Sequence, residues 1–303
     1  MKSPWIECLR SVSFDVPDLS EAERFYTEVW CLEVVTRAQD AIWLRGSGRD
    51  HHLLALHAAE GAPRLRSIVL RALESADLQN IAQAALDAGG RIERGVGAAD
   101  GPAGGQSIVV TDSEGRRFEI VQGDDQRQPD DPPPSDKPVR LAHTVLNCRD
   151  IQLAQRFLER AFGFVLADRT RIMAFMNCND DHHSLALGDS DNNALNHVAF
   201  LMPSLEAVMR GGGRLKDAGF PAQWGPGRHG PGDNAFNYFV DPFGIVIEYT
   251  AEVEQIDDSY HPGGPLDWTW PAGRIDQWGI GVAPTDLLKK AQRSILFAEP
   301  IIL

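Results

Sequence analysis

Apolar and polar residues follow the same order of patterns in each half of the chain. A segment of alternating apolar and polar residues leads to a helix start containing Asp, and an amphipathic helix follows, with apolar side chains at helical spacing in the second half at Leu153, Phe157, Leu158 and Phe162. Short β-rich segments come next, then a second helix over 75–89 or 204–219. Two last strands are joined through Asp-Ser-Glu-Gly or Asp-Pro-Phe-Gly, a composition typical of tight turns. Each half therefore predicts two βαβββ-like units.

The two halves also match residue by residue, which indicates an internal duplication. SVSFDVPDLSEAERFYTEVWCLEVV from Ser11 aligns with HTVLNCRDIQLAQRFLERAFGFVLA from His143, and DHHLLAL from Asp50 aligns with DHHSLAL from Asp181. Two further pairs follow, LRSIVLRAL with LNHVAFLMP and TDSEGRRFEIVQ with VDPFGIVIEYTA. The offset between the halves falls only from 132 to 129 residues along these matches, so few insertions separate them.

The boundaries of the repeat divide the chain into four parts. Residues 1–122 and 139–252 are the two copies, and residues 123–138 are rich in Pro and acids and predict a solvated linker. Residues 253–303 have no counterpart in the first half, and we expect a tail with a helix near 284–297, packed on the body or on a neighbouring subunit. The fold class is therefore α+β, with tandem βαβββ modules in two duplicated domains plus a C-terminal helical tail.

Composition and charge exclude several classes of protein. The 303 residues carry a net charge of −14 and no basic patch, so nucleic acid is not an expected partner. The four Cys form no CxxC pair, which is typical of buried thiols in a reducing compartment. Neither a signal sequence nor an apolar run of membrane-spanning length is present, so we expect a cytoplasmic protein without membrane contact.

Two His and one Glu occupy matching places on strands of the second half. His143 lies on the first strand, His197 on the strand before the second helix and Glu248 on the last strand. Two imidazoles and one carboxylate on one face form the set that binds Fe(II) and leaves adjacent positions open. A single strand His is usually structural. However, the first half has Ser11, Ser67 and Glu119 at the matching positions, in the same order, so the ligands are confined to one copy and we expect the first half to be metal-free.

Four further polar residues are candidates for the same site, and each has a plainer interpretation. His182 and His183 point to opposite faces if they lie on an alternating strand, and because DHH recurs in the half without ligands, a structural role is favoured for His182. The Gly/Pro-rich segment RHGPGDN places His229 on a loop at the cavity edge or on an ordinary surface turn. Tyr238 is either a pocket hydroxyl or a half-buried strand aromatic.

Together these residues resemble the type I extradiol ring-cleavage dioxygenases of the vicinal oxygen chelate superfamily. The resemblance covers about residues 5–252 and is most specific in RHGPGDNAFNYFVDPFGIVIEYT, where His, Tyr, Asp-Pro-x-Gly and Glu come in the family's order and spacing. Asn237 departs from the pattern, which usually has an apolar residue before the Tyr. This departure concerns the pocket and not the reaction.

The resemblance implies the vicinal oxygen chelate fold and a role for each candidate. His143, His197 and Glu248 would ligate Fe(II), in a ligand set that also accepts Mn(II). His183 would be the catalytic acid/base, for which an ordinary imidazole pKa of about 6.5 is suitable. His229 and Tyr238 would hydrogen-bond a catechol-type substrate. We expect the pocket to be shaped by residues such as Ile172, Phe175, Met176, Asn177, Pro231 and Phe236.

The implied reaction is extradiol cleavage of a substituted catechol by O2, in aromatic hydrocarbon catabolism. Both oxygen atoms enter the ring-opened product, which is of the hydroxymuconic semialdehyde type. The Trp-rich tail favours a homo-oligomer.

Two alternatives share this fold. A glyoxalase- or epimerase-like enzyme typically uses four ligands, often from both halves, whereas the first half offers only Glu119. A non-enzymatic small-molecule binding protein needs only a pocket, so retention of His183, His229 and Tyr238 favours chemistry. Oxygen uptake with a catechol panel separates all three.

Overall fold

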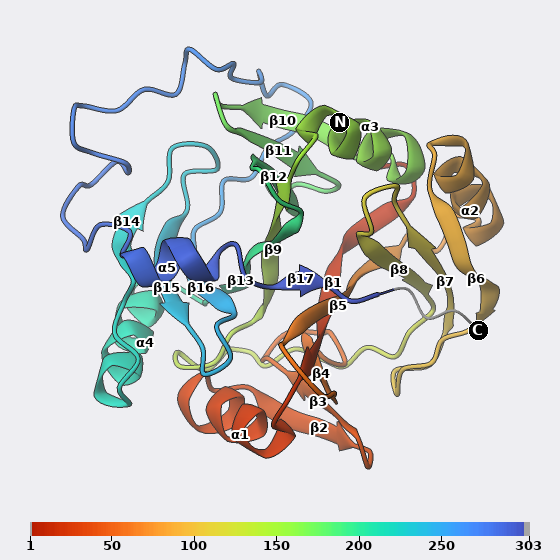
Figure 1. Cartoon of the computed structure of the whole chain (residues 1–303), viewed down its shortest axis with the longest axis horizontal. Coiled ribbons are helices and arrows are strands. Elements are labelled where there is room, and N and C mark those ends of the chain that lie inside the picture. The colour runs from red at the N-terminus through yellow and green to blue at the C-terminus, as the bar shows by residue number, and fades with distance from the viewer. Residues whose placement is uncertain (1, 300–303) are drawn as a thin grey trace.

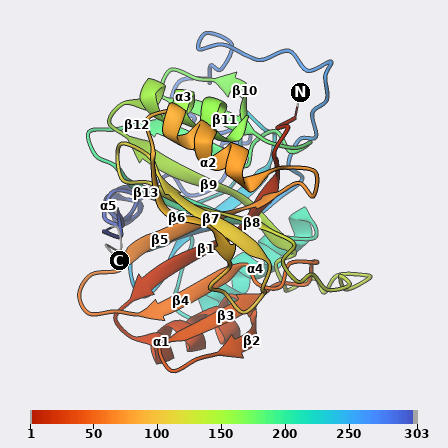
Figure 2. The ribbon, with the colours of Figure 1, turned by 90° about the vertical axis from the view of Figure 1, so that its right-hand side faces the viewer.

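The computed structural model describes residues 2–299 and consists of two large sheets, one from each half (Figures 1 and 2). The first half contains β1 (Ile6–Val16), α1 (Leu19–Arg24), the π-helical turn η1 (Phe25–Val29), β2 (Glu33–Arg37), β3 (Ala41–Arg45), β4 (Leu54–Ala58), β5 (Arg64–Ala72), α2 (Leu78–Asp87), β6 (Arg91–Ala98), β7 (Gln106–Thr111) and β8 (Arg117–Gln122). The second half contains β9 (Arg140–Cys148), α3 (Ile151–Phe162), β10 (Val165–Arg169), β11 (Met173–Asn177), β12 (Leu185–Asp189), β13 (Ala194–Leu201), α4 (Leu205–Asp217), β14 (Trp224–Arg228), β15 (Ala235–Val240) and β16 (Val246–Ala251). The tail adds α5 (Asp286–Ala291) and β17 (Leu296–Phe297).

The two sheets have the same topology, which confirms the fold class and its βαβββ modules. The strand order is β2-β3-β4-β1-β5-β8-β7-β6 in one sheet and β10-β11-β12-β9-β13-β16-β15-β14 in the other, with β17 added beside β5. The register repeats as well: Ser13 pairs with Ser67 between β1 and β5, and Val145 pairs with His197 between β9 and β13. Residues at matching positions of the alignment therefore lie at matching positions of the fold.

The first helix of each half begins where the sequence places an Asp. The Asp18 carboxylate accepts a hydrogen bond from the Glu21 N–H at 2.9 Å, and the Asp150 carboxylate accepts one from the Leu153 N–H at 2.8 Å. These N-caps satisfy backbone donors that have no partner within the helix. Gly163 ends α3 with a φ of 67°, a conformation that glycine adopts without steric cost.

One continuous hydrophobic core joins the two halves. Figures 1 and 2 show α2 and α3 side by side. The ring of Phe157, on α3, stacks on that of Phe118, on β8, across the boundary. At the other end of the boundary, Trp30 is fully buried and stacks on Tyr249 with ring centroids 3.7 Å apart. The second half therefore rests on aromatic side chains of the first half.

The linker and the tail differ from the sequence-based expectation. Asp124, at the start of the expected solvated linker, is buried, and its carboxylate accepts hydrogen bonds from Arg10 and Arg71, whose unpaired charges would be costly inside the protein. The expected helix over 284–297 is shorter, because α5 ends at Ala291 and the β-prone Leu296 and Phe297 pair with the start of β5 instead. The rest of the described tail is largely irregular, so the tail contains the one expected helix in a shorter form.

None of the helices within residues 2–299 is long and apolar enough to cross a bilayer.

Candidate metal centre and catalytic cavity

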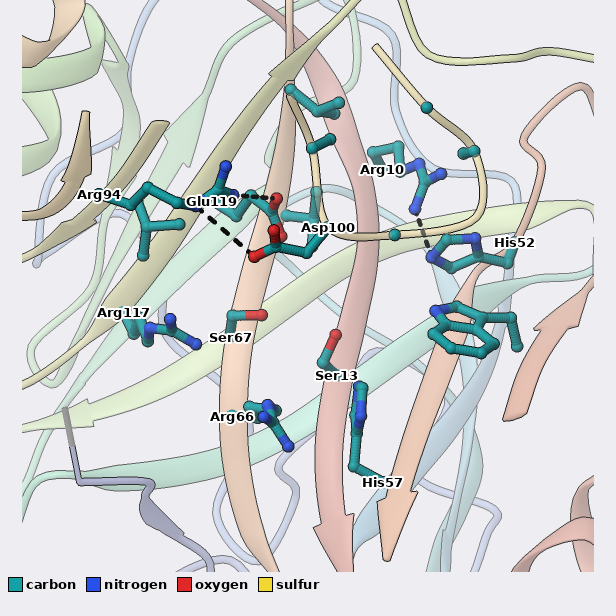
Figure 3. Close-up of a pocket in the computed structure, with 18 residues that line it drawn as sticks. Arg10, Ser13, His52, His57, Arg66, Ser67, Arg94, Asp100, Arg117 and Glu119 are labelled. Carbon is teal, nitrogen blue, oxygen red and sulfur yellow. Dashed lines mark hydrogen bonds and ion pairs between the residues drawn. The ribbon is translucent and has the colours of Figure 1, made fainter. Parts of the chain in front are cut away.

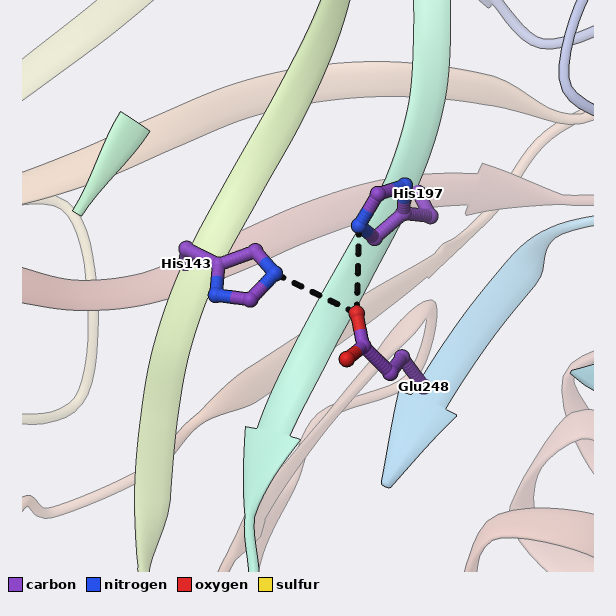
Figure 4. Close-up of side chains that lie close together, drawn as sticks. All are labelled: His143, His197 and Glu248. Carbon is purple, nitrogen blue, oxygen red and sulfur yellow. Dashed lines mark hydrogen bonds and ion pairs between the residues drawn. The ribbon is translucent and has the colours of Figure 1, made fainter. Parts of the chain in front are cut away.

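Three strands of the second sheet bring His143, His197 and Glu248 together (Figure 4). Strands β9, β13 and β16 are neighbours, and each contributes one of these side chains. The Nε2 atoms of both imidazoles lie 3.2 Å from Oε2 of Glu248, and one ligand atom from each residue lies within 4.8 Å of the others. All three residues are buried. The sequence-predicted triad is thus assembled on one face.

The protonation states of the triad fit a divalent cation. Burial acts to raise the pKa of Glu248, but the facing imidazoles of His143 and His197 lower it below its usual range, so the carboxyl is ionised. Burial lowers the pKa of His197, which favours a neutral ring. Asn196 Oδ1 lies 2.8 Å from Nδ1 of His197 and accepts a hydrogen bond from that N–H, which leaves the Nε2 lone pair facing the cluster. Imidazole nitrogen atoms and a carboxylate are suitable ligands for Fe(II) or Mn(II).

A network from the C-terminal tail supports this orientation. Asn196 is the extra residue of a β-bulge between β13 and β9, which turns its side chain toward the cavity. Gln292, which follows α5, donates its side-chain N–H to Asn196 Oδ1 at 2.9 Å, and Asn196 donates to Asn147 Oδ1 at 2.9 Å. Asn147 in turn donates to the Gln292 carbonyl at 2.8 Å. The tail is therefore connected to a ligand of the metal centre.

The triad opens into a cavity of about 290 Å³. Of the six expected pocket residues, Ile172, Phe175 and Pro231 line it, whereas Met176, Asn177 and Phe236 do not. Asn177 lies at the end of β11 and donates to the Asn179 carbonyl, while Phe236 is fully buried with its ring stacked on His229. Sequence reasoning missed several lining residues, namely Val145, Met173, Asn196, Trp224 and Gln292.

His183 lines the cavity and His182 lies behind it. The DHH segment is a loop before β12 and not a strand, so strand alternation does not separate the two rings. His182 is fully buried, with Nε2 at 2.8 Å from Asp168 Oδ2 and Nδ1 at 3.0 Å from Nδ1 of His183. His51 and His52 repeat the Nδ1 contact at 3.1 Å in the first half. This repetition supports a structural role for His182.

The pKa of His183 differs from the ordinary value expected from the sequence. Burial and the neighbouring ring of His143 lower it well below 6.5. The ring is therefore neutral at pH 7, and it can accept a proton before it donates one.

His229 and Tyr238 both line the cavity and contact each other there. The Tyr238 hydroxyl lies 3.0 Å from Nε2 of His229 and 3.3 Å from Nε2 of His197. Burial lowers the pKa of His229 to about 4, and burial together with Glu248 raises that of Tyr238 well above 10. Trp224 stacks on the Tyr238 ring with centroids 4.8 Å apart. Both groups are therefore neutral and held in place at pH 7.

The family model that matches the chain covers both halves. It is the model of the Glyoxalase/Bleomycin resistance protein/Dioxygenase superfamily, and it matches residues 9–120 and 140–249. The chain belongs to this superfamily.

Two relatives that match part of the chain are named metapyrocatechases. The chain is 34% identical to Metapyrocatechase 2 of Cupriavidus necator over 154 residues, which are 48% of this chain and 46% of the relative. It is 26% identical to Metapyrocatechase of Pseudomonas sp. (strain CF600) over 137 residues, 43% of this chain and 44% of that protein. These alignments span less than half of either relative.

Solved structures of the superfamily share the whole fold. A Mn(II)-bound glyoxalase from Novosphingobium aromaticivorans is 32% identical with a TM-score of 0.86, and the match covers 94% of both chains. An extradiol ring-cleaving dioxygenase from B. fuscum is 22% identical with a TM-score of 0.79, covering 92% of this chain and 80% of that one. The fold of this superfamily is thus established for both halves of the chain.

In the superfamily fold of the first half, an arginine faces the carboxylate that corresponds to Glu248. Arg94 donates to Glu119 Oε1 at 3.1 Å, and Ser107 donates to the same oxygen at 2.8 Å. The positions equivalent to the two imidazoles are Ser11 and Ser67. A metal-free first half stays a prediction, and a guanidinium on Glu119 supports it because that charge competes with a cation.

Proposed function

We propose that the protein is an Fe(II)-dependent extradiol dioxygenase that opens the ring of a substituted catechol with O2. The observation that carries the proposal is that the triad of His143, His197 and Glu248 opens into a cavity that also contains His183 and Tyr238. Three protein ligands leave positions for a second chelating molecule, whereas a closed structural site uses four. The named metapyrocatechase relatives support the same reaction class.

The chain's own side chains would bind the catechol and move its protons. A bound Fe(II) would lower the pKa of the diol and bring the substrate and O2 together. His183, neutral at pH 7, would accept a proton from the substrate and return it later. The hydroxyl of Tyr238, held by His229, would donate a hydrogen bond to the developing oxyanion. Phe175 and Trp224 would cover the ring and exclude water.

The dimensions of the cavity favour a small aromatic substrate. Its volume of about 290 Å³ is at the low end of the range for small-molecule pockets, roughly 300–1,000 Å³. A monocyclic catechol therefore suits it better than a biaryl. Ile172 lines the cavity and is 63% exposed, so a ring substituent would extend past this side chain toward solvent.

A metal-dependent glyoxalase is the second candidate, favoured by 32% identity to the Mn(II)-bound glyoxalase. Such an enzyme rearranges its substrate without consuming O2. Against it stands the ligand set, because the described residues contain one cluster of three metal-ligating groups and Glu119 of the other half is occupied by Arg94. Measuring O2 consumption distinguishes the two functions.

The decisive experiment is anaerobic reconstitution with Fe(II) or Mn(II), followed by O2 uptake and product absorbance across a catechol panel. We expect uptake with at least one monocyclic catechol and loss of that uptake in His143→Ala, which removes a ligand. His261→Ala alters an exposed His of the tail and should retain full activity. Protein that binds metal and catechol but consumes no O2 would refute the proposal.

Assembly into a homo-oligomer stays a prediction. The tail exposes several apolar residues, with Leu266 78% and Ile280 79% accessible, and these would be covered in a subunit contact. Light scattering of the purified protein would test it, and a monomeric mass would overturn it.

A further inference from the structure

The first half contains a cavity of about 150 Å³ at the position that corresponds to the catalytic cavity (Figure 3). Ser67 and Glu119 line it, at the positions that His197 and Glu248 occupy in the catalytic half. His52 occupies the position of His183, which lines the catalytic cavity. The duplicated scaffold has therefore kept a pocket in the half that lacks the metal-binding imidazoles. The residues around this pocket show which kind of ligand it fits.

Groups that donate hydrogen bonds have replaced the apolar and metal-ligating groups of the catalytic half. When the two sheets are aligned by strand register, Arg66 occupies the position equivalent to Asn196, Arg117 that of Val246 and Arg94 that of Trp224. Ser13 likewise takes the place of Val145, and His57 that of Gly188. The catalytic cavity is thus suited to a cation and an aromatic ring, whereas the cavity of the first half is lined by guanidinium, hydroxyl and imidazole groups.

A β-bulge aims one of these arginines into the cavity. Ser13 pairs with Ser67 and Phe14 pairs with Leu65, so Arg66 is the extra residue on β5. Adjacent side chains of a regular strand point to opposite faces, whereas a bulge redirects one of them. Both Arg66 and Ser67 therefore line the cavity, as Asn196 and His197 do in the other half.

Arg66 and Arg117 each donate a hydrogen bond through one nitrogen atom to a carboxylate that does not line the cavity. Arg66 donates through Nη1 to Asp15 at 2.9 Å, and Arg117 donates through Nε to Glu93 at 2.7 Å. Among residues 2–299, the remaining nitrogen atoms of these two guanidinium groups have no protein hydrogen-bond partner. Figure 3 shows both groups beside Ser67, with their free ends in the cavity. The arginines are thus fixed in place with donors left unused.

Two buried hydroxyl groups complete the donor set. Ser13 and Ser67 are 7% and 6% exposed, and neither hydroxyl has a hydrogen-bond partner in the described part of the chain. Burial and the neighbouring Arg66 lower the pKa of His57 to about 4, so its ring is neutral at pH 7 and offers an N–H. The lining also includes two carboxylates, Glu119 and Asp100, and both are paired with Arg94. These hydroxyl and guanidinium groups line the cavity with donors that no described side chain uses, so they are available to the oxygen atoms of a ligand.

We propose that this cavity binds a small oxyanion, a phosphate or a short carboxylate, between Arg66, Arg117 and the hydroxyls of Ser13 and Ser67. Guanidinium groups match the planar and tetrahedral oxygen arrangements of both anions, and hydroxyl groups supply further donors. The volume of about 150 Å³ limits the ligand to a few heavy atoms. Binding in this half requires neither a metal nor the catalytic cavity.

Calorimetric titration of the full-length, metal-free protein tests the proposal at constant ionic strength with chloride as the background salt. Inorganic phosphate and acetate are titrated separately, and we expect saturable binding of at least one, at one site per chain. Binding of phosphate alone assigns a phosphate site, and binding of acetate assigns a carboxylate site. No saturable binding of either anion would overturn the proposal.

Two double variants locate the binding. Ser13→Ala/Ser67→Ala and Arg66→Gln/Arg117→Gln should each weaken binding at least tenfold, while Arg91→Gln, a matched change of an exposed arginine in the same half, should leave it unchanged. If the arginine variant fails to fold, the serine variant still decides, since it leaves no charge unpaired. Unchanged affinity in the serine variant would place the anion elsewhere and refute the assignment.

Discussion

Replacement of Asn196 by Ala tests whether the bulge next to His197 orients the metal ligand. The change removes the oxygen that accepts a hydrogen bond from the His197 Nδ1–H at 2.8 Å, so the ring can take the other tautomer and rotate. Partners of this kind typically affect metal affinity 10–100-fold, which corresponds to about 1.4–2.8 kcal/mol. We expect a loss of Mn(II) or Fe(II) affinity in that range.

A graded series of variants separates orientation from general loosening of the tail. Gln292→Ala removes one neutral hydrogen bond to Asn196, worth about 1 kcal/mol or roughly fivefold in affinity. Asn196→Asp keeps an oxygen toward His197 and should restore affinity to within a few-fold of the wild type. Asn192→Ala is the matched control, because Asn192 bonds to the Arg293 carbonyl of the same tail without touching His197.

The assay is titration of the metal-free protein with Mn(II) against a competing chelator, followed by electron paramagnetic resonance. This measurement reports binding without turnover. Equal affinity of the wild type and Asn196→Ala would refute the reasoning, as would an Asn192→Ala variant that loses as much as Asn196→Ala.

Three other predictions concern stability and specificity. Trp30→Ala should lower the free energy of unfolding by about 3–5 kcal/mol, because it removes the buried ring that stacks on Tyr249 and leaves a cavity. Urea denaturation measures this loss, and a value below about 1 kcal/mol would contradict the prediction. Burial raises the pKa of Asp241, which accepts a hydrogen bond from Tyr26, to about 7 from 3.8. The folded state therefore binds this proton more tightly than the unfolded state does. As pH rises from about 4 to 7, the free energy of unfolding of the wild type should fall relative to that of Asp241→Asn. A difference between the two that does not change with pH would be the opposing result. In steady-state kinetics, Ile172→Ala should raise KM for a 4-alkylcatechol and leave KM for catechol unchanged. Because Ile172 is exposed, the free energy of unfolding should change by no more than about 0.5 kcal/mol. Equal changes in both KM values would argue against a place for Ile172 at the cavity opening.

The ligand triad could be predicted from the sequence because it depends on features that a sequence contains. His143, His197 and Glu248 are metal-ligating residue types, and comparison of the two copies of the repeat located them on strands. The topology of a βαβββ module then brings those strands together. The same alignment identified Ser67 and Glu119 as counterparts of His197 and Glu248.

The surroundings of the triad could not be predicted in the same way. Gln292 contacts Asn196 from 96 positions along the chain, through a tail without a repeat partner, and no periodicity indicates that contact. The bulge that aims Asn196 into the cavity is likewise absent from the apolar pattern. Phe236 has the expected residue type for a pocket, but whether His229 would stack over it depends on the course of a loop. The pKa of His183 depends on burial that only the packed structure defines.

The ion pair between Arg94 and Glu119 restricts how the first half could change by mutation. Introducing His at Ser11 or Ser67 would place an imidazole beside a carboxylate already neutralised by a guanidinium. Replacing Arg94 alone would leave a carboxylate without its positive partner and without two nitrogen ligands. Conversion of the first half into a second three-ligand site would therefore require a change at Arg94 as well as at Ser11 and Ser67.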